Sequence, residues 1–236
     1  MSEILLGDVN GQGSITGKFR DGLAYDVLAR SPLVLWFTCA AGAMAWHLSS
    51  EFARISEFSA AVVLEVAARL AALGFFMLLA AALSLRMRPV ARAAGVLPRL
   101  VAFCGTFSIT ALAFFPKVEM SPAMASASLM LMLLGYGLAS YTVAHLGRSL
   151  SMMAEARRLV TSGPYALLRH PLYAAEAMAS LGILLQFLSP AAGMLWAVHI
   201  ALQFCRMHYE EKVLRQTFPE YQGYALRVAR LVPGAY

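Results

Sequence analysis

The sequence is poor in charged side chains, and this shortage indicates the class of protein. Only 14% of the 236 residues are Asp, Glu, Lys or Arg, whereas 60% are hydrophobic and the mean hydropathy is +0.65. Water-soluble domains carry about 25% charged and about 45–50% apolar residues. A water-soluble fold would leave much of this apolar surface uncovered, so the sequence predicts an integral-membrane protein.

Cysteine is scarce as well. Cys39, Cys104 and Cys205 each lie in an apolar stretch, and none has a C-x-x-C partner. No other metal-ligand spacing appears, so no metal site is predicted. The net charge is +6, but the basic residues lie in short segments between apolar runs rather than on one solvated face. Nucleic acid is therefore not an expected partner, whereas membrane lipids are.

The first 30 residues lack the apolar core of a signal peptide, because they are polar and rich in glycine. We expect residues 1–30 to form a cytosolic, partly amphipathic segment. Pro32 is then expected to start the first membrane span, since proline is favoured at the first position of a helix.

Six apolar runs are candidates for membrane spans, because a bilayer core needs about 20 such residues per helix. They cover residues 32–48, 60–85, 100–115, 123–146, 172–188 and 191–205. The last two are short and separated only by Ser189 and Pro190, which predicts a short helical hairpin that need not cross fully. The sequence thus predicts an all-α, polytopic bundle of five to six spans. It is divided into four transmembrane helices (31–146) and a region (147–236) that ends in a cytosolic helical segment.

The basic residues predict the orientation of this bundle. Sixteen of the nineteen lysines and arginines fall before the first run, between runs two and three, between runs four and five, or after the last run. All four places lie on one side of the membrane, and the positive-inside rule makes this side cytoplasmic. We therefore expect both termini in the cytoplasm, in a bacterial inner membrane. Glu65 and Arg69, four residues apart within the second run, are expected to form an ion pair on one helix face.

Residues whose side chains could bind a ligand or take part in catalysis gather in the last third of the chain. The loop before the fifth run ends in LVTSGPYALLRHPLY (159–173), and the tail reads RMHYEEKVLRQTFPEYQGYALRVARLVP (206–233). Pro171 predicts a helix start that presents Arg169 and His170, and a helix N-terminus favours an anion. Tyr173 and Glu176, in the first turns of that helix, can face the same pocket. An ordinary basic anchor at a helix start would give the same pattern, and the residues alone leave both interpretations open.

The two elements in this order, around a short helical hairpin, resemble the isoprenylcysteine carboxyl methyltransferase family and its phospholipid methyltransferase relatives. The resemblance covers about residues 146–233 and implies an integral-membrane methyltransferase that uses S-adenosylmethionine and no metal. It implies a set of residues that enclose this cofactor, namely Arg169, His170, Pro171, Tyr173, Glu210, Tyr221 and Tyr224. It also implies that Arg206 and Glu211 are catalytic. Arg206 would lie near the transferred methyl group, and Glu211 would act together with Arg206.

Two departures from the family pattern leave the identity of the methyl acceptor open. Pro219 follows Phe218 and Ala175 follows Ala174, where relatives commonly have glycine. We expect a hydrophobic or lipid-linked acceptor, with a carboxyl or thiol group favoured and a phospholipid amine next. A carboxylate needs no base, whereas a thiol or amine must lose a proton, to Glu211, His208 or a tyrosine.

The alternative is a non-catalytic membrane protein, a transporter subunit or scaffold with a degenerate pocket. The sequence does not indicate an oligomeric state. It lacks a glycine-rich Rossmann fingerprint after a strand, which excludes a soluble methyltransferase domain.

Overall fold

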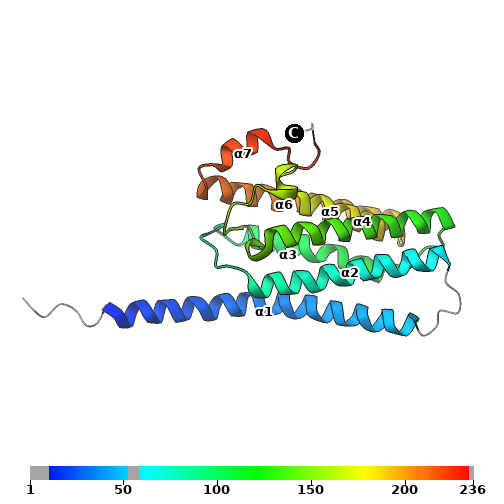
Figure 1. Cartoon of the computed structure of the whole chain (residues 1–236), viewed down its shortest axis with the longest axis horizontal. Coiled ribbons are helices and arrows are strands. Elements are labelled where there is room, and N and C mark those ends of the chain that lie inside the picture. Colours follow the sequence, from blue (N-terminus) through cyan, green and yellow to red (C-terminus); the bar gives the residue numbers. More distant parts are fainter. Residues whose placement is uncertain (1–10, 53–58, 234–236) are drawn as a thin grey trace, which may run out of the picture.

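A computed structural model of the chain describes residues 11–52 and 59–233. The elements are α1 (Gly11–Phe52), α2 (Ala60–Leu85), β1 (Ala91–Arg92), α3 (Leu97–Phe107), the 3-10 helix η1 (Ser108–Phe114), α4 (Pro122–Leu146), η2 (Gly147–Ser149), β2 (Glu155–Ala156), η3 (Gly163–Ala166), α5 (Pro171–Leu185), α6 (Pro190–Thr217) and α7 (Tyr221–Arg227). The two strands are only two residues each, and long helices make up the body of the molecule (Figure 1).

Three helices begin where a serine caps the first turn. The hydroxyl groups of Ser59, Ser121 and Ser189 accept hydrogen bonds from the backbone N–H three residues later, at 3.3, 3.3 and 3.2 Å. Each bond satisfies one of the free N–H groups of a helix N-terminus. Prolines directly after two of these serines, and at the start of α5, fix the first helical position.

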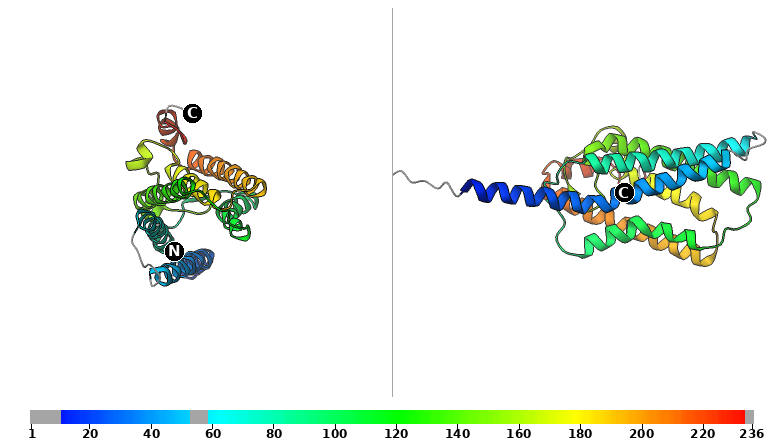
Figure 2. Two further views of the ribbon diagram at one scale, coloured as in Figure 1. Left: turned by 90° about the vertical axis from the view of Figure 1, so that its right-hand side faces the viewer. Right: turned by 90° about the horizontal axis from the view of Figure 1, so that it is seen from below.

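The helices pack side by side in the order α1, α2, α4 and α5, while α3 packs against α6 (Figures 1 and 2). The main apolar core lies between α1, α2, α4 and α5 and is built around aromatic side chains. The ring of Phe75 lies 5.5 Å from that of Tyr136, and Phe37 stacks on Phe76 at 6.1 Å. This core holds the helices that carry the site described below.

Small residues bring α4 and α5 into backbone contact. A Cβ added to Gly135 would lie 2.5 Å from the backbone N of Ala179, and one added to Gly182 would lie 2.7 Å from the Ser128 carbonyl oxygen. The Ser128 hydroxyl donates a hydrogen bond to the Gly182 carbonyl at 2.7 Å. Such seams are typical of helices that pack in a membrane, where close van der Waals contact replaces hydrophobic burial. The seam fixes the position of α5 against α4.

Four stretches of the described helices are long and apolar enough to cross a membrane: Arg30–Ser50, Ala60–Leu85, Leu97–Phe114 and Pro122–Ser149. Helix α5 is apolar but shorter, at 15 residues. Large apolar side chains such as Phe103 and Phe114 are exposed on the outside of the bundle, which suits a lipid environment. These observations confirm the predicted all-α, polytopic bundle.

Two predicted boundaries are wrong. Pro32 lies inside α1, which begins at Gly11, so the helix does not start at Pro32. The part of α1 that is long and apolar enough to cross a membrane still begins at Arg30. The sixth run and the tail are not separate either, because α6 continues without interruption through Arg206 to Thr217. No proline or glycine occurs between residues 194 and 218, so nothing in this stretch interrupts a helix.

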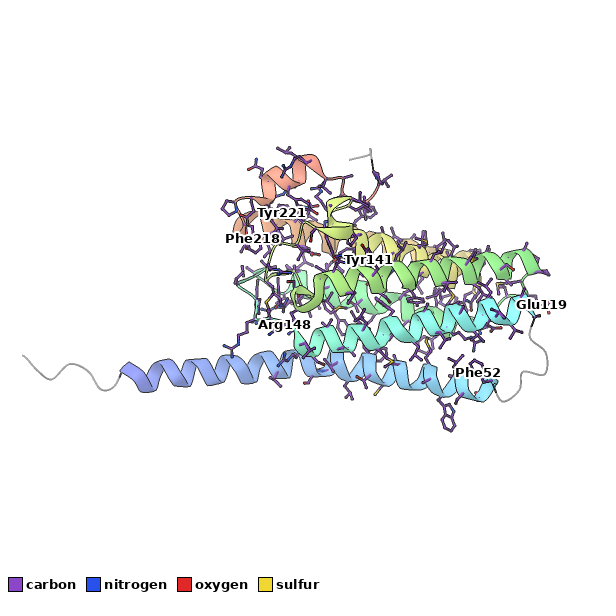
Figure 3. The ribbon with its side chains drawn as sticks, viewed as in Figure 1. Phe52, Glu119, Tyr141, Arg148, Phe218 and Tyr221 are labelled. Atoms are coloured by element: carbon purple, nitrogen blue, oxygen red, sulfur yellow. The ribbon has the colours of Figure 1, made fainter. Side chains whose placement is uncertain are left out.

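The two ends of the bundle differ in composition. Phe52 and Glu119 mark one end, whereas Arg148, Phe218 and Tyr221 lie at the other (Figure 3). The three segments between α2 and α3, between α4 and α5, and after Thr217 thus share one end, as the charge pattern predicts. Within α2, the Arg69 Nη2 lies 2.6 Å from the Glu65 Oε1, which confirms the predicted ion pair.

Short backbone pairings hold the segments together at the basic end. β1 pairs with β2 in antiparallel register, with Ala91 opposite Ala156. The backbone N–H of Met87 donates to the Arg148 carbonyl at 2.8 Å. These bonds join the loop after α2 to the loop after α4, and together the two loops close this end of the bundle.

Candidate active site

The loop that leads into α5 depends on a glycine. Gly163 has a φ of +60°, and a Cβ at this position would lie 2.3 Å from the Cδ2 of His145. Both the left-handed backbone and the contact with the ring of His145 exclude a side chain. The turn directs residues 164–170 toward the C-terminal tail.

We call Arg169, His170 and Pro171 the R-H-P element, and its backbone is hydrogen-bonded to the tail. The N–H groups of Arg169 and His170 donate to the carbonyls of Ala229 and Arg230, at 2.8 and 3.1 Å. Leu168 and Ala229 form a parallel β-bridge at the same place. The loop and the tail, about 60 residues apart in the sequence, thereby form one structural unit.

Glu211 lies at the centre of a cationic cluster. Its Oε1 lies 3.0 Å from the His170 Nε2, 3.2 Å from the Arg169 Nη1 and 3.3 Å from the Arg230 Nε. Its Oε2 lies 3.2 Å from the Arg215 Nη2. The carboxylate is 8% exposed, so these contacts are shielded from water.

This cluster keeps the carboxylate ionised. Burial by itself raises the pKa of Glu211, but the hydrogen bond from His170 and the charges of Arg169 and Arg230 outweigh it and hold the pKa below its ordinary value. Glu211 therefore joins three parts of the chain, namely the end of α6, the R-H-P element and the last described residues of the tail.

Four tyrosines line the space next to this cluster. The Tyr224 hydroxyl donates to the Tyr165 carbonyl at 2.6 Å, and the Tyr173 hydroxyl donates to the Glu210 Oε2 at 3.0 Å. Burial raises the pKa of Tyr224 to about 12 and also raises the pKa of Tyr165 and Tyr221. The three hydroxyl groups therefore keep their protons at neutral pH.

Arg206 lies one turn before this cluster on α6 and is held from several sides. Its Nη1 donates to the Gln203 Oε1 at 2.8 Å, and its Nη2 donates to the Met152 carbonyl at 3.3 Å. The guanidinium carbon lies 5.2 Å from the centre of the Tyr173 ring, within the range of a cation–π contact. On α3, a Cβ added to Gly105 would lie 2.6 Å from the Arg206 Cδ, so the stem of Arg206 occupies the space that a side chain at position 105 would need.

A cavity of about 870 Å³ lies at the basic end, and we name it the polar cavity because many of its wall residues are charged. It is lined by Leu79, Leu146, Ser149, Leu150, Ser151, Met152, Glu155, Arg157, Arg158, Leu159, Val160, Tyr165, Arg169, His170, Leu172, Tyr173, Glu176, Arg206, Glu210, Leu214, Tyr221 and Tyr224.

A second cavity, of about 850 Å³, lies between the helices, and we name it the apolar cavity. It is lined by Trp36, Phe37, Ala40, Phe75, Phe76, Leu79, Gly105, Thr106, Phe107, Ile109, Thr110, Tyr136, Met152, Glu176, Ala179, Ser180, Ile183, His199, Gln203 and Arg206. The two cavities share four wall residues, which are Leu79, Met152, Glu176 and Arg206. The charged residues in this shared wall are therefore reached from both cavities.

The structure brings most of the predicted site residues together. Seven of them line the polar cavity: Arg169, His170, Tyr173, Arg206, Glu210, Tyr221 and Tyr224. Pro171 and Glu211 line neither of the two cavities. Pro171 begins α5, and Glu211 contacts Arg169 and His170 behind the wall. The expected partnership of Glu211 with Arg206 is not seen among the contacts of the described residues.

Sequence reasoning missed two groups that contact the predicted residues, and an ion pair in the wall of the polar cavity. Gln203 donates to the Glu176 Oε2 at 3.1 Å and accepts from Arg206. Met152 supplies a carbonyl to Arg206, and Arg157 pairs with Glu155 at 2.7 Å in the wall of the polar cavity. For Gln203 a signal was present, because an amide in an apolar helix needs a partner. No group of three or more His, Cys, Asp or Glu side chains that suits a metal ion occurs within the described ranges.

The fold is that of a helical membrane protein with a polar cavity at its basic end and an apolar cavity between its helices. Residues 124–221 match the family model described as phospholipid methyltransferase. Protein-S-isoprenylcysteine O-methyltransferase B of Arabidopsis thaliana is 32% identical over 132 residues, which cover 53% of this chain and 67% of that protein. The chain belongs to the isoprenylcysteine carboxyl methyltransferase-like and phospholipid methyltransferase family, as the resemblance predicted.

Two bacterial relatives carry other names. The cobalt-zinc-cadmium resistance protein CzcN of Cupriavidus metallidurans is 34% identical over 107 residues. The nickel-cobalt-cadmium resistance protein NccN of Alcaligenes xylosoxydans is 30% identical over 106 residues. The matched part covers 43% of this chain and 50% of each of these two proteins.

Proposed function

We propose that this protein transfers the methyl group of S-adenosylmethionine to an acceptor with an apolar tail, at the cytoplasmic face of a bacterial inner membrane. The observation that supports this proposal is the wall shared by the two cavities. A polar methyl donor that comes from water suits the polar cavity, and a membrane-borne acceptor suits the apolar cavity. The two would meet at Arg206 and Glu176, which belong to both walls.

The residues of the polar cavity fit S-adenosylmethionine. The Ser149 Oγ is buried in the wall and has no hydrogen-bond partner among the described residues, so it is free to bond to a ligand. Glu210 offers carboxylate oxygens to hydroxyl or ammonium groups, and Arg169 and His170 offer positive or polar groups to a carboxylate. Tyr165 and Tyr221 offer aromatic surface to a nucleobase.

The chain's own contribution is mainly positioning. S-adenosylmethionine supplies, when bound, a methyl group on a positively charged sulfur. Arg206 is held by Gln203 and by the Met152 carbonyl, and its remaining N–H groups can orient an acceptor in the shared wall. Glu211 acts as a positioning residue, because it holds Arg169 and His170 in the wall without lining the cavity itself.

Binding of S-adenosylmethionine tests the donor site directly. We expect a micromolar Kd by calorimetry, about −8 kcal/mol, and a roughly tenfold higher Kd for Glu210→Gln, which removes one of the three carboxylates of the wall. Glu220→Gln is the matched control, since Glu220 is exposed and outside the cavity wall. Equal affinities of the two variants would mean that the methyl donor binds elsewhere.

Labelling of single cysteines tests the orientation. After Cys39, Cys104 and Cys205 are replaced by alanine, a membrane-impermeant maleimide applied to intact cells should label Glu119→Cys. It should label Leu226→Cys only after permeabilisation, because the basic end faces the cytoplasm in our proposal. Both positions are exposed, so accessibility within the protein does not decide the result. Labelling of Leu226→Cys in intact cells would contradict the proposed membrane face.

Methylation assays separate the proposal from the alternative of a non-catalytic protein. Purified protein should transfer a labelled methyl group from S-adenosylmethionine to at least one acceptor with an apolar tail. A protein that binds the methyl donor but methylates no acceptor in a panel of thiols, carboxylates and amines would support a degenerate pocket instead.

A further inference from the structure

Glu176 is a carboxylate at the junction of the two cavities. It lies in the second turn of α5, is only partly buried, and lines both cavities. Of the acidic residues in the described ranges, it alone contributes to the apolar cavity. A carboxylate in such an apolar surrounding is costly unless it is bonded, and it calls for a functional explanation.

A bridge of hydrogen bonds fixes Glu176 relative to Arg206. The Gln203 Nε2 donates to the Glu176 Oε2 at 3.1 Å, and the Gln203 Oε1 accepts from the Arg206 Nη1 at 2.8 Å. Because the amide donates on one side and accepts on the other, it holds Glu176 as an acceptor and Arg206 as a donor. The carboxylate and the guanidinium are thus presented together, as a charge-balanced pair, to whatever enters the apolar cavity.

This pair discriminates between acceptor groups by charge. A carboxylate acceptor would place a second negative group beside Glu176, which opposes the attraction of Arg206. An ammonium would add positive charge beside Arg206 and a sulfonium methyl donor. A thiol enters uncharged, and it must lose a proton to become a good nucleophile, since the thiolate is the reactive form.

We infer that Glu176 accepts the proton of a thiol group on an apolar carrier, so that the acceptor of this site is a thiol and not a carboxylate. The inference rests on the function proposed above. The thiol proton moves to the Glu176 carboxylate, and the acceptor sulfur forms a bond to the methyl carbon. The bond between that carbon and the sulfonium sulfur breaks, and its electron pair stays on the leaving thioether. Glu176 then releases the proton to water, so the balance is one thioether product, one demethylated donor and one proton.

Three probes with the same tail test this inference: dodecanethiol, dodecanoate and dodecylamine, each with S-adenosylmethionine. We expect the wild type to methylate the thiol at least about a hundredfold faster than the other two. Glu176→Gln should lower thiol turnover about a hundredfold, the lower end of the usual effect of a general base. This substitution keeps the size of the side chain and an oxygen that can accept from Gln203. Glu119→Gln is the matched control, because Glu119 is exposed at the opposite end of the bundle (Figure 3).

Two further readouts separate proton transfer from a structural role. Residual turnover of Glu176→Gln should rise about tenfold per pH unit through the neutral and mildly alkaline range, because the thiolate fraction grows at this rate below the pKa of the alkanethiol, whereas the wild type should depend less on pH. The charged and titratable groups that face Glu176 are Tyr165 on η3, Tyr173 on α5, Tyr136 on α4, and His199, Arg206 and Glu210 on α6. They are unchanged in the variant, so they do not account for a difference between the two profiles. Without the methyl donor, dodecanoate should bind more tightly to Glu176→Gln than to the wild type, because the repulsion is removed.

The outcomes distinguish the inference from the proposed function. Faster methylation of dodecanoate or dodecylamine than of the thiol would overturn the inference and leave the methyltransferase function standing. Equal thiol turnover and pH profiles of Glu176→Gln and Glu119→Gln would also overturn it. Methylation of none of the three probes by protein that binds S-adenosylmethionine would count against the proposed function itself, and the inference would fall with it.

Discussion

Replacing Arg206 by lysine is expected to lower turnover about a hundredfold while the affinity for S-adenosylmethionine changes less than about twofold. Lysine keeps the charge but has no planar fork, so it cannot hold the contacts with the Gln203 Oε1 and the Met152 carbonyl at the same time. It also loses the flat contact with the Tyr173 ring at 5.2 Å. Steady-state kinetics and calorimetry on the same preparation separate the two effects.

Arg227→Lys is the control for this substitution. Arg227 is exposed on α7, where its Nε donates to the Gly223 carbonyl at 3.1 Å, and it lines neither cavity. We expect wild-type turnover for this variant. Full turnover of a folded Arg206→Lys protein would remove Arg206 from the mechanism and leave the orientation of the acceptor to Glu176 and Gln203.

Replacing Glu211 by glutamine is expected to destabilise the protein by about 3 kcal/mol, because it leaves several cationic side chains without the buried charge that compensates them. Arg169, His170 and Arg230 all lie within 3.3 Å of one oxygen of this carboxylate. Since Arg169 and His170 line the polar cavity, the affinity for S-adenosylmethionine should fall as well. Thermal unfolding in detergent measures the first effect, and calorimetry the second.

The stability difference between wild type and Glu211→Gln should depend on pH in one direction. The folded protein holds the pKa of Glu211 below its ordinary value of 4.5. Its contribution is therefore fully present above about pH 4.5 and is lost as the pH falls through the lower pKa of the folded state. The two proteins should converge at acidic pH, and Glu220→Gln, which changes an exposed carboxylate, should follow the wild type throughout. A constant difference down to the acid limit would show that Glu211 does not act through its charge.

Local signals in the sequence predicted the helices well. The apolar runs and the proline at the start of α5 correspond to helices in the structure. Ser59, Ser121 and Ser189, which did not enter the prediction, cap three of these helices. Pro32 gave the wrong start because a helix can continue through proline at the loss of one hydrogen bond. The preference of proline for the first position of a helix does not by itself show whether a given proline starts a helix or lies inside one.

Contacts between distant segments were harder to predict. The motif residues do gather in one place, as the resemblance implied, but no local signal indicates that the tail bonds directly to Arg169 and His170, 41 residues or more away. For this reason Glu211 was expected beside Arg206, its neighbour on the same helix, and is found with His170 instead. The apolar cavity was not predicted either, because its wall comes from helices whose sequences show only that they are apolar.

The match to the family model leaves out part of the wall of the apolar cavity. It covers residues 124–221, which include α5, α6 and the start of α7, whereas Trp36, Phe75 and Gly105 in the wall of the apolar cavity belong to α1, α2 and α3. The site is therefore a composite: one half is shared with the family, and the other half is encoded by residues outside the family match. In the function we propose, the acceptor would therefore contact side chains of the first three helices as well as the matched region, so residues outside the family match take part in its selection.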